Sequence, residues 1–238
     1  MRNDELPLPY RIAHLIIEND TTRTYLLEGR LEATPGQFVM VWLPGVNEKP
    51  FSLAGVDPIA LTIVRVGPFT EAVHKLKEGD RLWVRGPSGT GFSPEAGPAL
   101  LVAGGYGSAP LSFLAGELRN VGQEVYVALG AKTVDALLLR HRFENLGCAV
   151  HLTTEDGSAG RAGLATELAA MLLERVEIGA LYACGPNAML NALAPLAQKW
   201  NLPCQLSYEA YMRCGIGICG SCTCGDQLVC RDGPVFRF

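Results

Sequence analysis

The sequence predicts three consecutive parts: a small antiparallel β-barrel, an α/β domain built on a parallel sheet, and a cysteine-rich appendage. Three observations predict this order. Short β-rich runs between turn residues fill the first third of the 238-residue chain, strands alternate with helices after about Pro94, and five of the eight cysteines lie in the last 25 residues. We place the boundaries so that the parts cover residues 1–95, 96–208 and 209–238.

The barrel is predicted from β-rich runs that are separated by turns such as Pro35-Gly36, Pro44-Gly45 and Gly86-Pro87. Many short strands at this spacing are typical of a small antiparallel barrel. One helical stretch, about Thr70–Lys77, interrupts them. The expected strands are Arg11–Ile17, Thr22–Leu27, Phe38–Leu43, Leu61–Val66 and Arg81–Arg85.

The α/β domain is predicted from regular alternation. The apolar strand Leu100–Ala103 is followed by the helical stretch Pro110–Asn120, which has proline at an early helix position. Strands that alternate with helices imply a parallel sheet covered on both faces. The other expected strands are Glu124–Leu129, Ala149–Thr153, Ala180–Ala183 and Gln205–Tyr208, and the other expected helices are Asp135–Leu146, Leu164–Arg175 and Asn187–Trp200.

Composition argues against several classes of partner. The formal net charge is −4 and no basic block occurs, so we expect no nucleic acid partner. The uncharged stretch Ala96–Gly116 is long enough to span a membrane, but its glycines and prolines favour a strand, a turn and a helix, so we expect no membrane partner. Met1–Pro9 is polar and does not resemble a signal peptide, and the clustered cysteines favour metal binding over disulfides. We therefore expect a cytoplasmic protein.

The tail contains a C-x₄-C-x₂-C motif formed by Cys214, Cys219 and Cys222. Plant-type [2Fe–2S] sites use this spacing with a more distant fourth cysteine. We expect Cys230 to be that fourth ligand, because Cys224 lies only two residues beyond Cys222 and would have to distort the loop. Glycines between the cysteines would let backbone amides approach the cluster. Structural zinc is the alternative, although Cys₄ zinc sites usually show two separated C-x₂-C pairs.

The segments on either side of these cysteines resemble a known family. Tyr208–Arg213 precedes the first ligand and Cys230–Phe236 begins at the last. Both are similar to the electron-transfer subunits of NAD-dependent dihydroorotate dehydrogenase, in the ferredoxin-reductase superfamily. The resemblance covers nearly the whole chain in the same motif order. It implies that the barrel binds FAD, the α/β domain binds NAD(H) and the appendage binds a [2Fe–2S] cluster.

For FAD, the resemblance implies three segments of the barrel. Lys49-Pro50-Phe51-Ser52 resembles the family's Arg-Pro-x-Ser segment, which holds the flavin and its phosphate, with lysine in place of arginine. Ile63-Val64-Arg65 resembles the strand beside the isoalloxazine ring and the ribityl chain. Gly67 and Thr70 lie at the start of a helix, where amides and the helix dipole favour a pyrophosphate, although Thr70 could equally be an ordinary N-cap.

For the nicotinamide cofactor, two turns are implicated. Gly104, Gly105 and Gly107 form a glycine turn between a strand and a helix, where missing side chains let a dinucleotide approach the backbone. Tight packing of the strand on the helix is the alternative explanation. Cys184-Gly185-Pro186 follows a later parallel strand, at the edge where α/β sheets bind ligands. The family brings this turn to the nicotinamide, and the alternative is an inert buried cysteine.

The function implied by the resemblance is electron transfer between NAD(H) and a partner, through FAD and the cluster. The implied partner is an FMN-containing catalytic subunit that oxidises dihydroorotate to orotate in the de novo synthesis of UMP, and the family assembles two copies of each subunit. The chain itself would hold no orotate site and no catalytic acid or base, because hydride transfer depends mainly on alignment. The alternatives are a flavin and iron–sulfur subunit of a hydrogenase, sulfide dehydrogenase or ferredoxin–NAD(P) oxidoreductase complex, and a non-enzymatic redox sensor.

Overall fold

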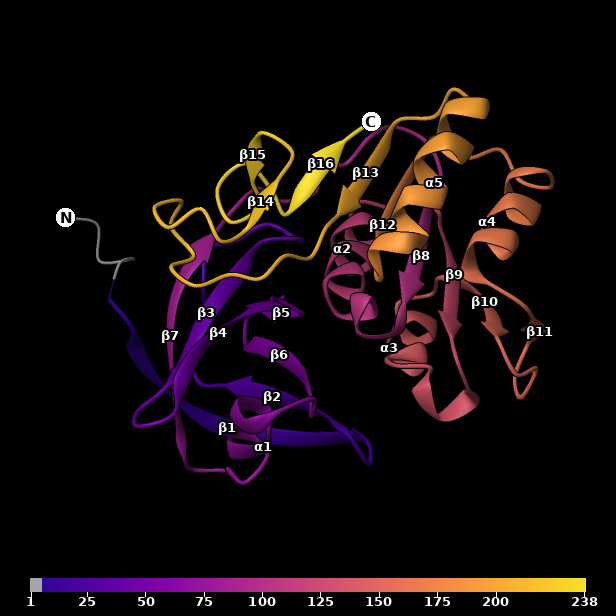
Figure 1. Ribbon diagram of the computed structural model, residues 1–238. Helices are drawn as coiled ribbons and strands as arrows, with labels where there is room; N and C mark the ends of the chain where they lie inside the picture. Colours follow the sequence, from indigo (N-terminus) through magenta and orange to yellow (C-terminus); the bar gives the residue numbers. More distant parts are fainter. Residues whose placement is uncertain (1–5) are drawn as a thin grey trace. The chain divides into compact units, whose positions relative to one another are not determined.

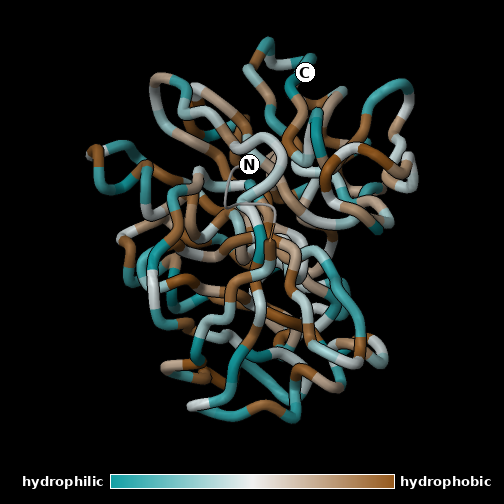
Figure 2. The backbone as a smooth tube through the Cα atoms, turned by 90° about the vertical axis from the view of Figure 1, so that its left-hand side faces the viewer, coloured by the Kyte–Doolittle hydropathy of each residue, from teal (hydrophilic) through white to brown (hydrophobic). Residues whose placement is uncertain are grey.

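The computed structural model describes residues 6–238, which divide into two compact units (Figure 1). The first unit runs to Gly91 and also includes Ala210–Pro234, and the second comprises Phe92–Glu209 with Val235–Phe238. The cysteine-rich segment therefore belongs to the same unit as the N-terminal strands. Hydrophobic and hydrophilic segments alternate along the chain (Figure 2).

The first unit contains a seven-stranded antiparallel sheet with the order β4-β3-β7-β1-β2-β6-β5. Strands β4 and β6, far apart in that order, also contact each other, as in a barrel. Its elements are β1 (Leu8–Asn19), β2 (Thr22–Leu27), β3 (Phe38–Leu43), β4 (Asn47–Ser52), β5 (Gly55–Val56), β6 (Ile59–Val64), α1 (Pro68–Val73), β7 (Arg81–Ser88), and the small hairpin of β14 (Thr223–Cys224) and β15 (Gln227–Leu228).

Two sequence expectations for this unit need correction. Lys49–Ser52, which lies in none of the expected strands, is part of β4, in which Pro50 lies opposite Met40. Pro50 is tolerated because β4 is an edge strand. One side of this strand has no partner, so a missing N–H there removes no hydrogen bond between strands. The helix expected over Thr70–Lys77 begins earlier and ends at Val73, and it is only six residues long.

The second unit contains a seven-stranded sheet with the order β11-β10-β9-β8-β12-β13-β16. All neighbours are parallel except β16, which pairs antiparallel with β13. The strands are β8 (Ala99–Gly104), β9 (Val125–Ala131), β10 (Ala149–Thr154), β11 (Arg161–Ala162), β12 (Ala180–Cys184), β13 (Cys204–Ser207) and β16 (Val235–Arg237). The main helices are α2 (Ser108–Asn120), α3 (Arg140–Asn145), α4 (Ala165–Leu173) and α5 (Asn187–Lys199).

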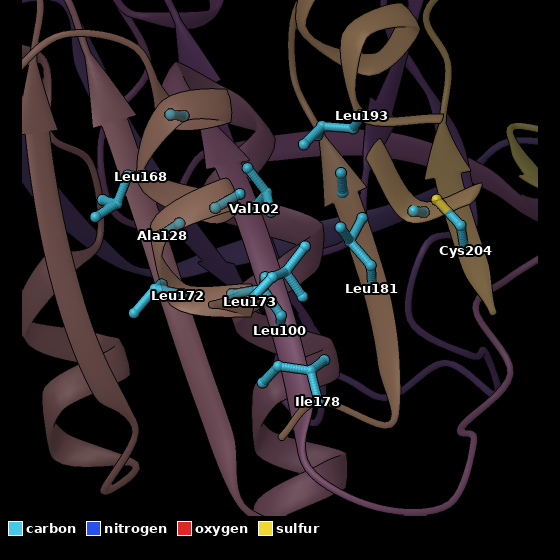
Figure 3. Packing of buried hydrophobic residues seen from close by; sticks show 14 of the residues in the cluster. Leu100, Val102, Ala128, Leu168, Leu172, Leu173, Ile178, Leu181, Leu193 and Cys204 are labelled. Carbon is cyan, nitrogen blue, oxygen red and sulfur yellow. The ribbon is translucent and has the colours of Figure 1, made fainter. Parts of the chain in front are cut away.

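The core of this unit explains its apolar strands. Every residue of β8 and β12 is buried, because helices cover both faces of the sheet. Helices α4 and α5 pack together over Leu100 and Val102 of β8 and Leu181 of β12 (Figure 3). Helices α2 and α3 pack together, and α2 contacts β8, β9 and β12.

The helix expected over Asp135–Leu146 is wrong in its first part. A short 3₁₀ turn, Val134–Ala136, occupies that position, and α3 begins only at Arg140. The cause is Leu139, which adopts a left-handed backbone with φ of 59°, and a helix cannot continue through that conformation. Within residues 6–238, no helix combines the length and the hydrophobicity needed to cross a membrane.

Candidate functional site

The four cysteines expected as ligands come together as two pairs in the segment Ala210–Pro234. The thiols of Cys214 and Cys219 interact with each other, and so do those of Cys222 and Cys230. The N–H of Gly217, which lies between Cys214 and Cys219, points at Sγ of Cys230, and the charge of Cys214 adds to the raised pKa of Cys230, so the two pairs are near each other. Cys224 is exposed on β14.

Backbone groups point at the buried pair of sulfurs. The N–H of Gly217 donates to Sγ of Cys230 at 3.2 Å, and the N–H of Cys230 donates to Sγ of Cys222 at 3.4 Å. Hydrogen bonds of this kind stabilise negative charge on a ligand sulfur. Burial raises the pKa of Cys230 to about 11, while hydrogen bonding with Ser221 lowers the pKa of the exposed Cys219 to about 6.

The paired arrangement suits a centre with two metal ions. In the part of the chain that the structure describes, no three His, Cys, Asp or Glu side chains converge on a single metal position. A [2Fe–2S] cluster takes two thiolates at each iron, and two pairs of thiols supply that donor set. The residues present therefore fit the cluster.

The three segments expected at the flavin lie together in the first unit. Helix α1 contacts β4, and β4 contacts β6. The ring of Phe51 on β4 stacks on that of Phe69 at the start of α1, with 6.0 Å between centroids. As an edge strand, β4 leaves backbone N–H and C=O groups available to a ligand. Lys49, Pro50 and Ser52 are partly exposed.

The members of the other two segments differ in accessibility. The side chain of Ile63 is fully buried, Val64 is partly exposed and Arg65 is exposed. The hydroxyl of Thr70 accepts the N–H groups of Val66 and Gly67 at 2.9 and 3.1 Å and donates to the carbonyl of Gly67 at 3.0 Å. These bonds close the turn before α1 from within the helix: Gly67 is the N-cap and Thr70 is the third helical residue, so Thr70 is not the ordinary N-cap that the sequence left open.

The two turns expected at the nicotinamide cofactor meet at one edge of the second sheet. Gly104–Gly107 begins at the last residue of β8 and Cys184–Pro186 at the last residue of β12, two neighbouring parallel strands at which the strand order reverses. Ligands of α/β sheets bind outside the carboxyl ends of strands at this position. A Cβ on Gly107 would lie 2.1 Å from the carbonyl oxygen of Cys184, so packing alone requires glycine there. Gly105 faces open space, with φ of 54°.

Tyr106, which is not among the predicted site residues, also reaches this edge. Tyr106 donates its hydroxyl hydrogen to the Glu209 carboxylate at 2.9 Å. Burial of the carboxylate raises the pKa of Glu209, although much of that residue remains exposed. Burial raises the pKa of the Cys184 thiol to about 12, so that thiol is neutral at physiological pH. The only sequence signal for Glu209 was its position just after the last parallel strand.

Known proteins are similar to this chain in sequence. Residues 209–238 match the iron–sulfur cluster binding domain of dihydroorotate dehydrogenase B. Over 234 residues the chain is 42% identical to a probable dihydroorotate dehydrogenase B (NAD(+)), electron transfer subunit, of Methanocaldococcus jannaschii, with 98% of this chain and 90% of that protein covered. A protein of the same description from Thermococcus kodakarensis is 47% identical over 215 residues, with 90% and 89% covered.

One solved structure matches nearly the whole fold. The NADH-dependent reduced ferredoxin–NADP oxidoreductase, studied for flavin-based electron bifurcation, superposes with a TM-score of 0.86 at 28% identity. The match covers 96% of this chain and 87% of the other. The predicted fold class is thereby confirmed: an antiparallel barrel-like sheet, a mostly parallel α/β domain and a C-terminal iron–sulfur region.

Proposed function

Because the chain belongs to the family of dihydroorotate dehydrogenase B electron-transfer subunits, we propose that it carries electrons between NAD(H) and an FMN-containing catalytic partner that oxidises dihydroorotate to orotate. As an electron-transfer component of an oxidoreductase, it would serve pyrimidine biosynthesis. The observation that carries this proposal is the two pairs of cysteine thiols in the same unit as the barrel. Two copies of each subunit are the proposed assembly.

We assign the flavin to the barrel. When bound, FAD exchanges a hydride with NAD(H) and single electrons with an iron–sulfur centre. Lys49, Pro50, Phe51 and Ser52 would hold it along the open edge of β4, with Lys49 near a phosphate. Ile63, Val64 and Arg65 would flank the ring and the ribityl chain, with Ile63 contributing only backbone and packing. Gly67 and Thr70 would shape the turn for the pyrophosphate, Thr70 through its capping bonds.

We assign NAD(H) to the edge of the second sheet. Gly105 would face the dinucleotide, while Gly104 and Gly107 keep the turn close to Cys184-Gly185-Pro186. Because the Cys184 thiol is neutral, it can contact the nicotinamide without placing a negative charge beside it. Cys214, Cys219, Cys222 and Cys230 are the proposed ligands of the cluster, one pair for each iron.

Replacing one cysteine at a time tests the proposal, with the chain co-purified with its catalytic partner. Cys219→Ser should lose iron and acid-labile sulfide and abolish NAD⁺ reduction by dihydroorotate, because one iron loses a ligand. NADH should still bleach the bound flavin, since that step precedes the cluster.

Cys224→Ser is the matched control, because Cys224 is an exposed cysteine in the same segment that belongs to neither pair. It should keep the iron content and the activity of the wild type. Full dihydroorotate-dependent activity in Cys219→Ser would contradict the proposal. A wild-type complex that carries all cofactors and yet passes no electrons would favour the redox-sensor alternative.

A further inference from the structure

Arg85 on β7 connects the cysteine segment to β4, the strand that contains the flavin segment Lys49–Ser52. Its Nε and Nη2 donate to the two carboxylate oxygens of Glu48, each at 2.7 Å. Its Nη2 also donates to the backbone carbonyl of Cys214 at 2.6 Å. The side chains of Arg85 and Glu48 are only 12% and 23% exposed. A paired fork of this kind is short, strong and fixed in direction.

The strand register explains why one side chain reaches both segments. Met40 of β3 lies opposite Arg85 on one side and Pro50 on the other. The cysteine segment covers Met40, since a Cβ on Gly215 would lie 2.8 Å from its Cγ. The first cysteine is therefore held against the strand that lies between Arg85 and the flavin segment.

A second contact joins the same two segments. The ammonium group of Lys49 lies 5.3 Å from the ring centre of Tyr211, three residues before Cys214. Glu48 and Lys49 are adjacent on β4, so both contacts start from the same edge strand. The segment that precedes the cluster is thus tied to β4 at two points.

From this geometry we infer that Arg85 and Glu48 position the Cys214 ligand relative to β4, and that their two opposite charges, balanced against each other, act on the reduction potential of the cluster. Residues outside the ligand shell orient metal ligands, and nearby charge and hydrogen bonds tune cluster potentials. Together the two side chains are neutral. Removing the charge of either side chain leaves the charge of the other unbalanced beside the Cys214 ligand. This inference rests on the proposed function.

Single-charge variants test the inference by the sign of a shift. Reduction adds negative charge to the cluster. Glu48→Gln leaves the Arg85 cation unbalanced and should raise the midpoint potential. Arg85→Gln leaves the Glu48 anion unbalanced and should lower it. The potentials are measured by redox titration of the complete complex, with the reduced cluster followed by electron paramagnetic resonance.

Two further variants separate charge from geometry. The double variant Glu48→Gln with Arg85→Gln should restore a potential close to that of the wild type, because no net charge remains. Arg85→Lys keeps the charge but loses the planar fork. It should slow cluster reduction by NADH about tenfold to a hundredfold while shifting the potential less than Arg85→Gln does.

The exposed pair Arg11 and Glu28, 3.2 Å apart, provides matched controls. Arg11→Gln and Glu28→Gln should leave the potential unchanged. Shifts of the same sign in Glu48→Gln and Arg85→Gln, or no shift in either, would overturn the inference. A wild-type complex without iron would instead refute the proposed function, so the two failures are distinguishable.

Discussion

Gly105 and Gly107 stand two residues apart in the turn after β8, and their surroundings impose different demands. Gly107 is packed against the backbone of Cys184, which no side-chain movement can relieve. Gly105 has free space around it but a left-handed backbone, which favours glycine for conformational reasons. Gly107 is thus explained by packing, whereas Gly105 leaves room for a ligand.

Replacing these glycines by alanine should separate the two demands. Gly107→Ala should lower the free energy of unfolding by about 3 kcal/mol or more, because the new Cβ overlaps main-chain atoms. Gly105→Ala should cost about 1–2 kcal/mol for the left-handed backbone, yet leave a folded protein with weaker NADH binding. Urea unfolding and NADH titration measure both effects. Equal losses of stability in the two variants would contradict this account.

Helix α1 shows how a very short element is held in place. Six residues are too few for a stable isolated helix, so contacts with other elements must fix it. The ring Nε2 of His74, just after the helix, lies 2.9 Å from the carbonyl oxygen of Ile63 on β6. The hydroxyl of Tyr25 and the guanidinium of Arg23 donate to the carbonyls of Val73 and His74, at 3.1 and 2.6 Å. These bonds fix the end of the helix whose start carries the proposed pyrophosphate turn.

The stability of the barrel unit should therefore depend on pH through His74. Burial lowers the pKa of His74 from its ordinary value of 6.5, and the charges of Arg23 and Arg65 add to this effect. The folded chain then binds fewer protons than the unfolded chain, so this contribution is present above pH 6.5 and is lost as the pH falls through the folded pKa.

The matched variant is His74→Gln, which keeps a side-chain N–H but does not titrate. Between about pH 7.5 and 5.5, the urea midpoint of the wild type should fall more steeply than that of the variant. Parallel curves for the two FAD-loaded proteins would show that His74 does not contribute.

At the scale of the whole molecule, the last strand closes the second sheet after the cysteine segment. Strand β16 pairs with β13, and Phe238 donates its N–H to the carbonyl of Cys204 at 2.9 Å. The ring of Tyr208 contacts those of Phe236 and Phe238, with centroids 6.0 and 6.2 Å apart. Each aromatic pair contributes about 0.5–1.5 kcal/mol beyond its buried area.

Ending the chain at Pro234 should therefore affect the cluster as well as the sheet. The truncated protein keeps all four proposed ligands but frees one end of the segment that carries them. We expect it to lose iron faster than the full chain when challenged with a chelator. Phe238→Ala, which keeps β16 in place, should give an intermediate rate. Identical rates in all three proteins would contradict this expectation.

Local patterns predicted much of the fold. The bounds expected for β2 and β3 agree with the structure, because alternation and turn residues are properties of neighbouring positions. Strand β4 was missed because proline argues against a strand unless its edge position is known. The left-handed Leu139 and the three-residue β16 carry no periodic signal at all.

The candidate site was predictable only in part, for a similar reason. The cysteine motif is local, so its spacing alone indicated a cluster. The contact of Tyr106 with Glu209 joins residues 103 positions apart, and that of Arg85 with Cys214 joins residues 129 apart. Such pairs are created by sheet order and register, which neither segment encodes by itself.

The cysteine segment leaves the second sheet after β13 and returns to it as β16, the antiparallel neighbour of β13. Ser207 lies directly opposite Val235, so the two ends of the excursion are about 5 Å apart across the ladder. In topological terms the whole iron-binding part is an oversized hairpin loop. Such a loop can be lengthened, shortened or removed without rethreading any other strand, because both of its ends lie at the same place on the second sheet.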